Sequence, residues 1–91
     1  MDAEVKVKWL AALRSGNYEQ ARGKLKIDKA YCCLGVLAHV QKSRVGTLPQ
    51  ADVLPDRLSA GLTKEAQREL AHRNDAGSSF AEIADYIEKT L

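Results

Sequence analysis

The longest apolar stretch of the chain lies at residues 30–40, where nine of the eleven side chains are apolar. Lysine and arginine are frequent on both sides of it, and the apolar residues elsewhere are spaced at intervals. An interrupted apolar pattern needs a continuous apolar surface to pack against. We therefore expect residues 30–40 to form the centre of the core, with the rest of the chain packed around them.

Residues 3–14 show the spacing of an amphipathic helix, and Gly16 is placed to end it. Trp9 lies on the apolar face, so we expect it to anchor the core and not to serve as an exposed stacking surface. Residues 33–41 predict a second helix that is apolar on nearly every side and therefore buried. Gly35 within this helix would let another element approach closely.

The C-terminal part of the chain carries two further helix patterns. Thr63 is placed to cap a helix over residues 64–73, and a turn is expected at residues 74–77. Ser79 and Glu82 have the spacing of a capping box, which predicts the start of the last helix. That helix has the clearest apolar stripe in the chain, made of Phe80, Ile83, Ala84, Ile87 and Leu91.

Two segments between these helices have different patterns. Residues 24–27 alternate lysines with Leu25 and Ile27, which is typical of a half-buried strand, and residues 28–29 would turn it back as a small hairpin. Residues 43–54 have no clear period and form a loop long enough to be a candidate binding loop. A short helix is expected at residues 55–59.

Together these elements predict one domain over residues 1–91, of the mainly α (α+β) class. We expect a compact bundle of four or five short helices with at most one small β-hairpin. Hydrophobic residues make up 45% of the chain and charged residues 29%, a balance typical of globular proteins and not of intrinsically disordered ones. A chain of 91 residues can bury an adequate hydrophobic core.

Charge is unevenly distributed, although the formal net charge is only +2. Residues 1–45 contain nine lysines and arginines against four acids, whereas residues 46–91 contain five against eight. The basic first half could form a binding face for a polyanion, or the two halves could simply attract each other. The sequence leaves both interpretations open.

Charged residues interrupt the apolar positions after Met1, so no signal peptide is expected, and no segment has the length of a membrane span. We therefore predict a cytoplasmic protein without a membrane partner. Cys32 and Cys33 are adjacent, which makes a disulfide between them sterically awkward, and there is no third cysteine. Both are expected to be free thiols.

The cysteines and histidines, which could act as nucleophiles, bases or metal ligands, do not form a familiar catalytic or metal-binding pattern. Cys32 and Cys33 diverge from each other and no CxxC or HxxxH spacing occurs, so we expect neither a metal site nor a cofactor. His39 lies too far along the predicted helix to act as a base for either thiol, and only folding could bring His72 near. The cysteines are thus predicted to be structural and the protein not to be an enzyme.

A polar binding face is predicted around the glycine-bounded connection after the first helix. Recognition residues concentrate on connections of this kind, because a rigid scaffold holds them in place. The candidate binding residues are Arg14, Tyr18, Gln20, Arg22 and Lys24. In the alternative interpretation, these side chains pack locally along the edge of a solvated loop.

Three sequence blocks span most of the chain. They are W-x-x-A-L-R-S-G-x-Y-x-Q from Trp9, Y-C-C-L-G-V-L from Tyr31 and N-D-x-G-x-S-F-x-x-I-A-x-x-I-E from Asn74. With this combination, the chain resembles a family of small, uncharacterised proteins carried by tailed bacteriophages and prophages. The resemblance implies a short phage gene product in the cytoplasm of an infected bacterium, and it carries no established activity.

Small phage proteins without enzyme motifs often act by binding, as anti-CRISPR proteins and sponges for signalling nucleotides do. By this analogy we expect an inhibitor of a bacterial antiviral defence system that holds a host defence protein or a small signalling ligand. The alternatives are a nucleic-acid-associated phage regulator that uses the basic N-terminal half and, ranked last, an enzyme that uses a cysteine. A homodimer is also considered, because a specific interface needs about 800 Å² per partner and two copies double the available surface.

Overall fold

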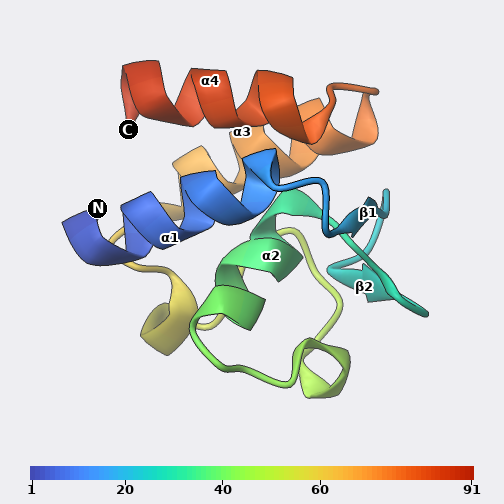
Figure 1. Cartoon of the computed structure of the whole chain (residues 1–91). Helices are drawn as coiled ribbons and strands as arrows, with labels where there is room; N and C mark the ends of the chain where they lie inside the picture. Colours follow the sequence, from blue (N-terminus) through green and yellow to red (C-terminus); the bar gives the residue numbers. More distant parts are fainter.

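The computed structural model describes all residues from Met1 to Leu91. Four α-helices form a bundle with a short sheet at its side (Figure 1): α1 (Ala3–Arg14), α2 (Cys33–Val40), α3 (Lys64–Asp75) and α4 (Phe80–Thr90). Helix α1 packs against both α2 and α4, and α3 also contacts these two helices (Figure 1). This arrangement confirms the predicted mainly α (α+β) class. None of the helices combines the length and the apolar character needed to cross a membrane.

Helix α2 forms the centre of the core, as the apolar stretch predicts. Every residue from Cys33 to Ala38 is buried, and the main hydrophobic cluster of 19 residues is built around them. Trp9 on α1 is fully buried, and its indole Nε1 donates a hydrogen bond to the carbonyl oxygen of Cys33 at 2.9 Å. The prediction that Trp9 anchors the core is therefore confirmed.

Gly35 allows the close approach that the sequence suggests. A Cβ atom at this position would lie 2.0 Å from the carbonyl oxygen of Leu25, so only glycine fits between α2 and the hairpin. The same oxygen accepts a hydrogen bond from the backbone N–H of Cys32 at 3.0 Å. The first turn of α2 is thus packed tightly against the segment that precedes it in the chain.

The predicted hairpin is present, formed by β2 (Lys26–Ile27) and β3 (Ala30–Tyr31), which pair in antiparallel orientation. The expectation that Leu25 and Ile27 would share a half-buried face is wrong. Leu25 is fully buried, whereas 43% of Ile27 is exposed. The strand has only two residues, so Ile27 already lies at the tip of the hairpin, beyond the helices that cover Leu25.

A third strand, β1 (Glu19–Gln20), pairs in parallel with β3 and was not predicted. Its two polar residues have no alternating pattern that would mark a strand. Pairing is extended by a hydrogen bond from the backbone N–H of Ala21 to the carbonyl oxygen of Tyr31 at 2.8 Å. The sheet order is therefore β1-β3-β2.

Both predicted caps in the C-terminal part are confirmed. The hydroxyl of Thr63 accepts a hydrogen bond from the backbone N–H of Ala66 at 3.0 Å, and Ser79 with Glu82 forms a complete capping box. Helix α3 ends at Asp75, two residues beyond the expected end at about residue 73, so the turn expected at residues 74–77 begins at Ala76. Asn74 in this last turn is fully buried, and its side chain is hydrogen-bonded to Gln20 and Ala21.

Residues 43–62 form a long connection with two 3-10 helices, η1 (Val45–Thr47) and η2 (Asp56–Leu58). The second lies within the short helix predicted at residues 55–59. Buried Gln67 on α3 attaches the connection, because its side chain accepts from the N–H of Leu54 at 2.7 Å and donates to the carbonyl of Leu62 at 3.3 Å. The loop is thereby held against α3.

Candidate functional site

The structure does not gather the five predicted binding residues on one free face. Arg14 at the end of α1 forms ion pairs with two carboxylates of α4, at 2.8 Å to Asp85 and 3.2 Å to Glu88. These hydrogen bonds raise the pKa of the Arg14 guanidinium, the bond to Asp85 contributing most. The side chain of Arg14 therefore links the first and the last helix.

Gln20 and Arg22 are brought together at Asn74. The Gln20 amide donates to the side-chain oxygen of Asn74 and to the carbonyl of Ser78, both at 2.8 Å. Arg22 Nε donates to the backbone carbonyl of Asn74 at 3.1 Å. Asn74 itself is fully buried, and its amide donates to the carbonyl of Ala21 at 2.8 Å. These contacts fasten the strand region to α3.

Tyr18 belongs to an aromatic cluster beside the sheet. Its hydroxyl lies 2.7 Å from Nδ1 of His39, and its ring meets the Tyr31 ring edge-on, with 5.5 Å between centroids. The ammonium of Lys26 lies 5.6 Å from the centroid of the Tyr31 ring. Burial, and to a smaller degree the nearby Tyr31, raises the pKa of Tyr18. The cluster is partly open to solvent.

Only Lys24 among the predicted binding residues is exposed without an ion pair or a side-chain hydrogen bond. The other four make the internal contacts described above, in agreement with the alternative of local packing. Their predicted role in binding a partner stays a prediction. Lys24, however, lies at the edge of a pocket that the sequence did not predict.

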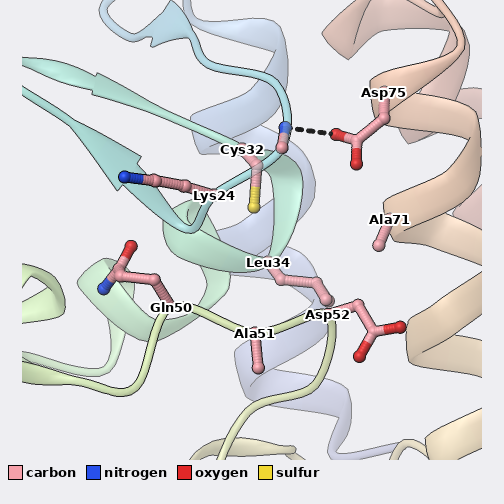
Figure 2. Close-up of a pocket in the computed structure, with 9 residues that line it drawn as sticks. Lys24, Cys32, Leu34, Gln50, Ala51, Asp52, Ala71 and Asp75 are labelled. Carbon is pink, nitrogen blue, oxygen red and sulfur yellow. Dashed lines mark hydrogen bonds between the residues drawn. The ribbon is translucent and has the colours of Figure 1, made fainter.

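The pocket opens between the start of the hairpin, the first turn of α2, the long loop and α3 (Figure 2). Its volume is about 110 Å³. Polar and apolar side chains share its wall, and four separate segments of the chain supply them. The lining residues are Gly23, Lys24, Cys32, Leu34, Gln50, Ala51, Asp52, Ala71 and Asp75.

Cys32 provides the thiol of the pocket. It is the N-cap residue of α2, and its sulfur accepts a hydrogen bond from the N–H of Gly35 at 3.4 Å. Only 5% of Cys32 is exposed, and Figure 2 shows its sulfur directed into the space between the lining residues. Burial raises the pKa of the Cys32 thiol, which therefore stays protonated at neutral pH.

Cys33 faces the opposite side, into the core. It is fully buried, and its sulfur lies 3.6 Å from the carbonyl oxygen of Leu70 on α3. Burial, and after it the neighbouring Cys32, raises the pKa of the Cys33 thiol well above the ordinary value of 9.0. Neither cysteine is bonded in a disulfide.

Two carboxylates line the α3 side of the pocket. Asp75 is held in place because one of its oxygens, Oδ1, accepts from the N–H of Gly23 at 2.8 Å and from the Asn74 amide at 3.1 Å. Asp52 lies 3.9 Å from Nε of Arg68, a long contact between exposed groups. In Figure 2 the ammonium of Lys24 is directed away from Asp75 and from Cys32. The pocket wall is therefore acidic on one side.

The pocket does not pair its thiol with a histidine. Neither histidine lines the pocket, and the Nδ1 atom of His39 is already bonded to Tyr18. A thiol that keeps its proton and has no base beside it is a poor nucleophile. No group of three or more histidine, cysteine, aspartate or glutamate side chains is placed to hold a metal ion.

Sequence reasoning missed Asn74, Asp75 and Gly23 as site-forming residues. Asn74 and Asp75 open the third sequence block, but their pattern predicts a turn and gives no sign of a partner fifty residues earlier in the chain. The long loop was recognised as a candidate binding loop, and it does supply three lining residues, namely Gln50, Ala51 and Asp52.

A family model matches the N-terminal half of the chain. A domain of unknown function, DUF8296, matches residues 1–47, which is slightly more than half of the 91 residues. The matched part includes α1, the sheet, α2 and η1. No curated protein and no solved structure is significantly similar to the chain. On the strength of the match over residues 1–47, the chain belongs to the DUF8296 family.

Proposed function

We propose that the protein is a phage or prophage accessory protein that acts by binding and inhibits a bacterial antiviral defence system. It would work in the host cytoplasm by holding a host defence protein or a small signalling ligand. The resemblance of the three sequence blocks to tailed-phage proteins supports the phage setting. The pocket beside Cys32 supports the binding mode, because it combines a defined shape with a carboxylate held in place, Asp75, and a thiol whose pKa is raised by burial.

The choice of binding over catalysis rests on the state of that thiol. Cys32 is the most reactive kind of side chain in the pocket, yet burial favours its protonated form. The neighbouring carboxylate, Asp75, is engaged through Oδ1 in hydrogen bonds that hold the backbone of Gly23. The pocket therefore offers recognition groups, and no nucleophile paired with a base.

A phage challenge tests the proposal. The tagged protein is expressed in bacteria that carry individual defence systems, the cells are infected, and whatever co-purifies with the tag is identified. We expect one system to be weakened and its protein or its signalling ligand to be recovered. If no system is weakened and only DNA is recovered in a salt-sensitive complex, the proposal is wrong.

Titration with the recovered target separates a binder from an enzyme. If the protein acts by holding its target, inhibition reaches its full extent at a fixed stoichiometry and does not increase with time. An enzyme would inactivate many target molecules per chain, and the effect would grow during incubation. Inhibition at strongly substoichiometric amounts would contradict the non-enzymatic mechanism.

A phage regulator that binds nucleic acid is the second candidate, and the aromatic cluster is the observation that favours it. Tyr18, Tyr31, His39 and Lys26 place rings and a cation on one partly exposed surface, a combination that suits nucleotides. This function predicts affinity for DNA that falls steeply with salt, by about one log unit per phosphate contact for each log unit of salt. Binding that does not change with salt would exclude it.

A further inference from the structure

We infer that the aromatic cluster beside the sheet, made of Tyr18, Tyr31, His39 and Lys26, binds single-stranded nucleic acid. Such a ligand names the form of nucleic acid within the second candidate function, on which this inference rests. The proposed inhibitor function uses the pocket beside Cys32 and does not depend on it. Three features of the cluster support the inference: rings that are not stacked on one another, cations without ion pairs around them, and an open surface.

The three rings form a compact group that can meet a nucleobase. Their centroids lie between 5.1 Å and 5.5 Å apart, and Tyr18 meets the rings of Tyr31 and His39 nearly at right angles. No ring is therefore covered by a parallel neighbour. The tyrosines are half-buried against the core, whereas His39 is exposed and its Nδ1 is held by the Tyr18 hydroxyl at 2.7 Å. Unpaired bases stack on aromatic side chains presented in this way.

Cations around the rings provide contacts for phosphates. The ammonium of Lys26 lies 5.6 Å from the centroid of the Tyr31 ring. Lys42 follows the last turn of α2, where its N–H donates to the carbonyl oxygen of His39 at 3.0 Å. Arg44 precedes η1, which contacts β2, the strand of Lys26. None of these three cations forms an ion pair within the protein, so each is available to a phosphate.

The region around the cluster is positive in a chain whose formal net charge is only +2. Residues 22–44 contain six lysines and arginines against one acid, Asp28, whereas the remaining residues contain eight against eleven. Asp28 and Glu19 are the acids of the sheet region, and neither forms an ion pair. The backbone carbonyl of Asp28 accepts from the ammonium of Lys26. A polyanion is therefore attracted to this region and repelled by much of the rest of the chain.

The open shape of the surface favours a strand over a free nucleotide and over a duplex. No ring of the cluster lines either of the two pockets in the structure. Small molecules are bound in concave sites that enclose them, and a free nucleotide would lack that enclosure here. A single strand collects its affinity from several bases and phosphates along an open groove or surface. In a duplex the bases are stacked on one another, so their faces cannot reach the rings.

Competition binding tests the form of the ligand. Fluorescence anisotropy follows a labelled oligothymidylate of about ten nucleotides, the size range of one single-strand site. Unlabelled strand, a duplex of equal length and thymidine monophosphate then compete for the wild-type protein. We expect the single strand to compete at concentrations at least about tenfold below those of the duplex and of the monophosphate.

The outcomes separate this inference from both candidate functions. Equal competition by the duplex overturns the inference and leaves the nucleic-acid regulator standing. Equal competition by the monophosphate also overturns it, because a free nucleotide would then be the ligand. If the labelled strand does not bind and the duplex does not bind either, the inference and the regulator function fall together. The inhibitor function is decided by the phage challenge in every case.

A pair of substitutions at His39 tests the stacking contact. His39 is exposed, so its replacement leaves the core unchanged. His39→Ala removes a ring and should weaken strand binding about tenfold, the usual effect of losing one stacked base. His39→Phe keeps a ring and should retain the wild-type affinity within about twofold. Unchanged binding by His39→Ala, or an equal loss in both variants, would overturn the stacking role.

A pair of lysine substitutions tests the phosphate contacts. Lys42 has a positive φ of 68°, which suits glycine, so Lys42→Gly keeps the backbone and removes the charge. The slope of log affinity against log salt should become smaller by about 0.7, the value of one phosphate contact on a single strand. Lys89→Gln is the control, at an exposed position of α4, which packs against α1 and α3. The placement of the strand is wrong if the two variants change the slope equally.

Discussion

The two sides of the first turn of α2 differ although the residues that form them, Cys32 and Cys33, are chemically identical. On the closed side, Cys33 is fully buried, its carbonyl accepts from Trp9, and its N–H donates to Asn74 at 3.2 Å. On the open side, Cys32 caps the helix through its sulfur, which accepts from the N–H of Gly35 at 3.4 Å, and it lines the pocket. Two adjacent thiols therefore occupy different environments.

The difference shows how this small chain can keep both a stable core and a binding site. Adjacent residues at a helix start diverge in direction, so Cys33 packs against α3 while Cys32, itself buried, lines the pocket. On the closed side, contacts with α1, α3 and the hairpin meet at one helical turn. On the open side, the backbone N–H of Cys32 still bonds to Leu25 at 3.0 Å, but the Cys32 side chain lines the pocket. The following predictions test this division, from the largest effect to the smallest.

The largest effect is expected for Gly35→Ala, which acts on the closed side. The added methyl group would lie 2.0 Å from the backbone oxygen of Leu25, and overpacking of this kind should lower the free energy of unfolding by about 3 kcal/mol or more. Urea denaturation measures the loss. The matched control is Gly46→Ala, where the nearest atom is a flexible carbon of Lys26 at 3.8 Å. A stable Gly35→Ala protein would contradict the tight packing described here.

Asn74→Ala should have the next largest effect. It leaves the N–H of Cys33 and the carbonyl of Ala21 without their partner, and we expect the free energy of unfolding to fall by about 2 to 3 kcal/mol. Asn17→Ala, at an exposed position, is the control and should change it by less than about 0.5 kcal/mol. Equal stability of the two variants would show that Asn74 does not hold the closed side together.

The cysteines themselves are compared by single substitution. Cys33→Ala removes a fully buried sulfur from the core, whereas Cys32→Ala enlarges a pocket that is already open. We expect losses of about 2 kcal/mol for Cys33→Ala and about 1 kcal/mol or less for Cys32→Ala. Thermal unfolding under reducing conditions gives both values. A larger loss for Cys32→Ala would reverse the assignment of the two sides.

The pH dependence of stability should be a smaller effect with a definite sign. Burial raises the pKa of Cys33 well above its ordinary value of 9.0, and that of Cys32 is also raised. The unfolded chain thus releases thiol protons first, so stability is at its full value below pH 9.0 and falls as the pH rises through the folded pKa. The decrease of the free energy of unfolding with rising pH should become smaller in Cys33→Ala than in Cys32→Ala. The opposite ranking would contradict the burial of Cys33.

Much of the fold could be predicted from the sequence. Helix α1, the buried helix α2, the caps of α3 and α4 and the hairpin follow from local spacing and capping residues, because these features depend on neighbours within a few positions. The third strand was missed, since Glu19 and Gln20 have no strand pattern and pair only because β3 lies beside them. The burial of Ile27 was predicted wrongly, because the alternation of polar and apolar residues does not show where the core ends.

The pocket could not be predicted, because contacts between distant segments create it. Asp75 and Gly23 are 52 positions apart and meet only in the folded protein. The binding residues predicted from sequence were polar or charged side chains around a glycine-bounded connection, yet Arg14 and Gln20 join helices and strands to one another. The sequence shows two adjacent cysteines with the same chemistry. Only the fold shows that Cys32 lines the pocket and that Cys33 does not.

The most direct test of the division between the two sides is the labelling of the folded wild-type protein with the small, neutral reagent methyl methanethiosulfonate. Tandem mass spectrometry of the peptide that contains both cysteines assigns each modification. The structure predicts that Cys32 is labelled first and that Cys33 reacts only when denaturant unfolds the chain. Labelling of Cys33 at a comparable rate in the folded protein, or of neither thiol before unfolding, would contradict the account of a closed and an open side.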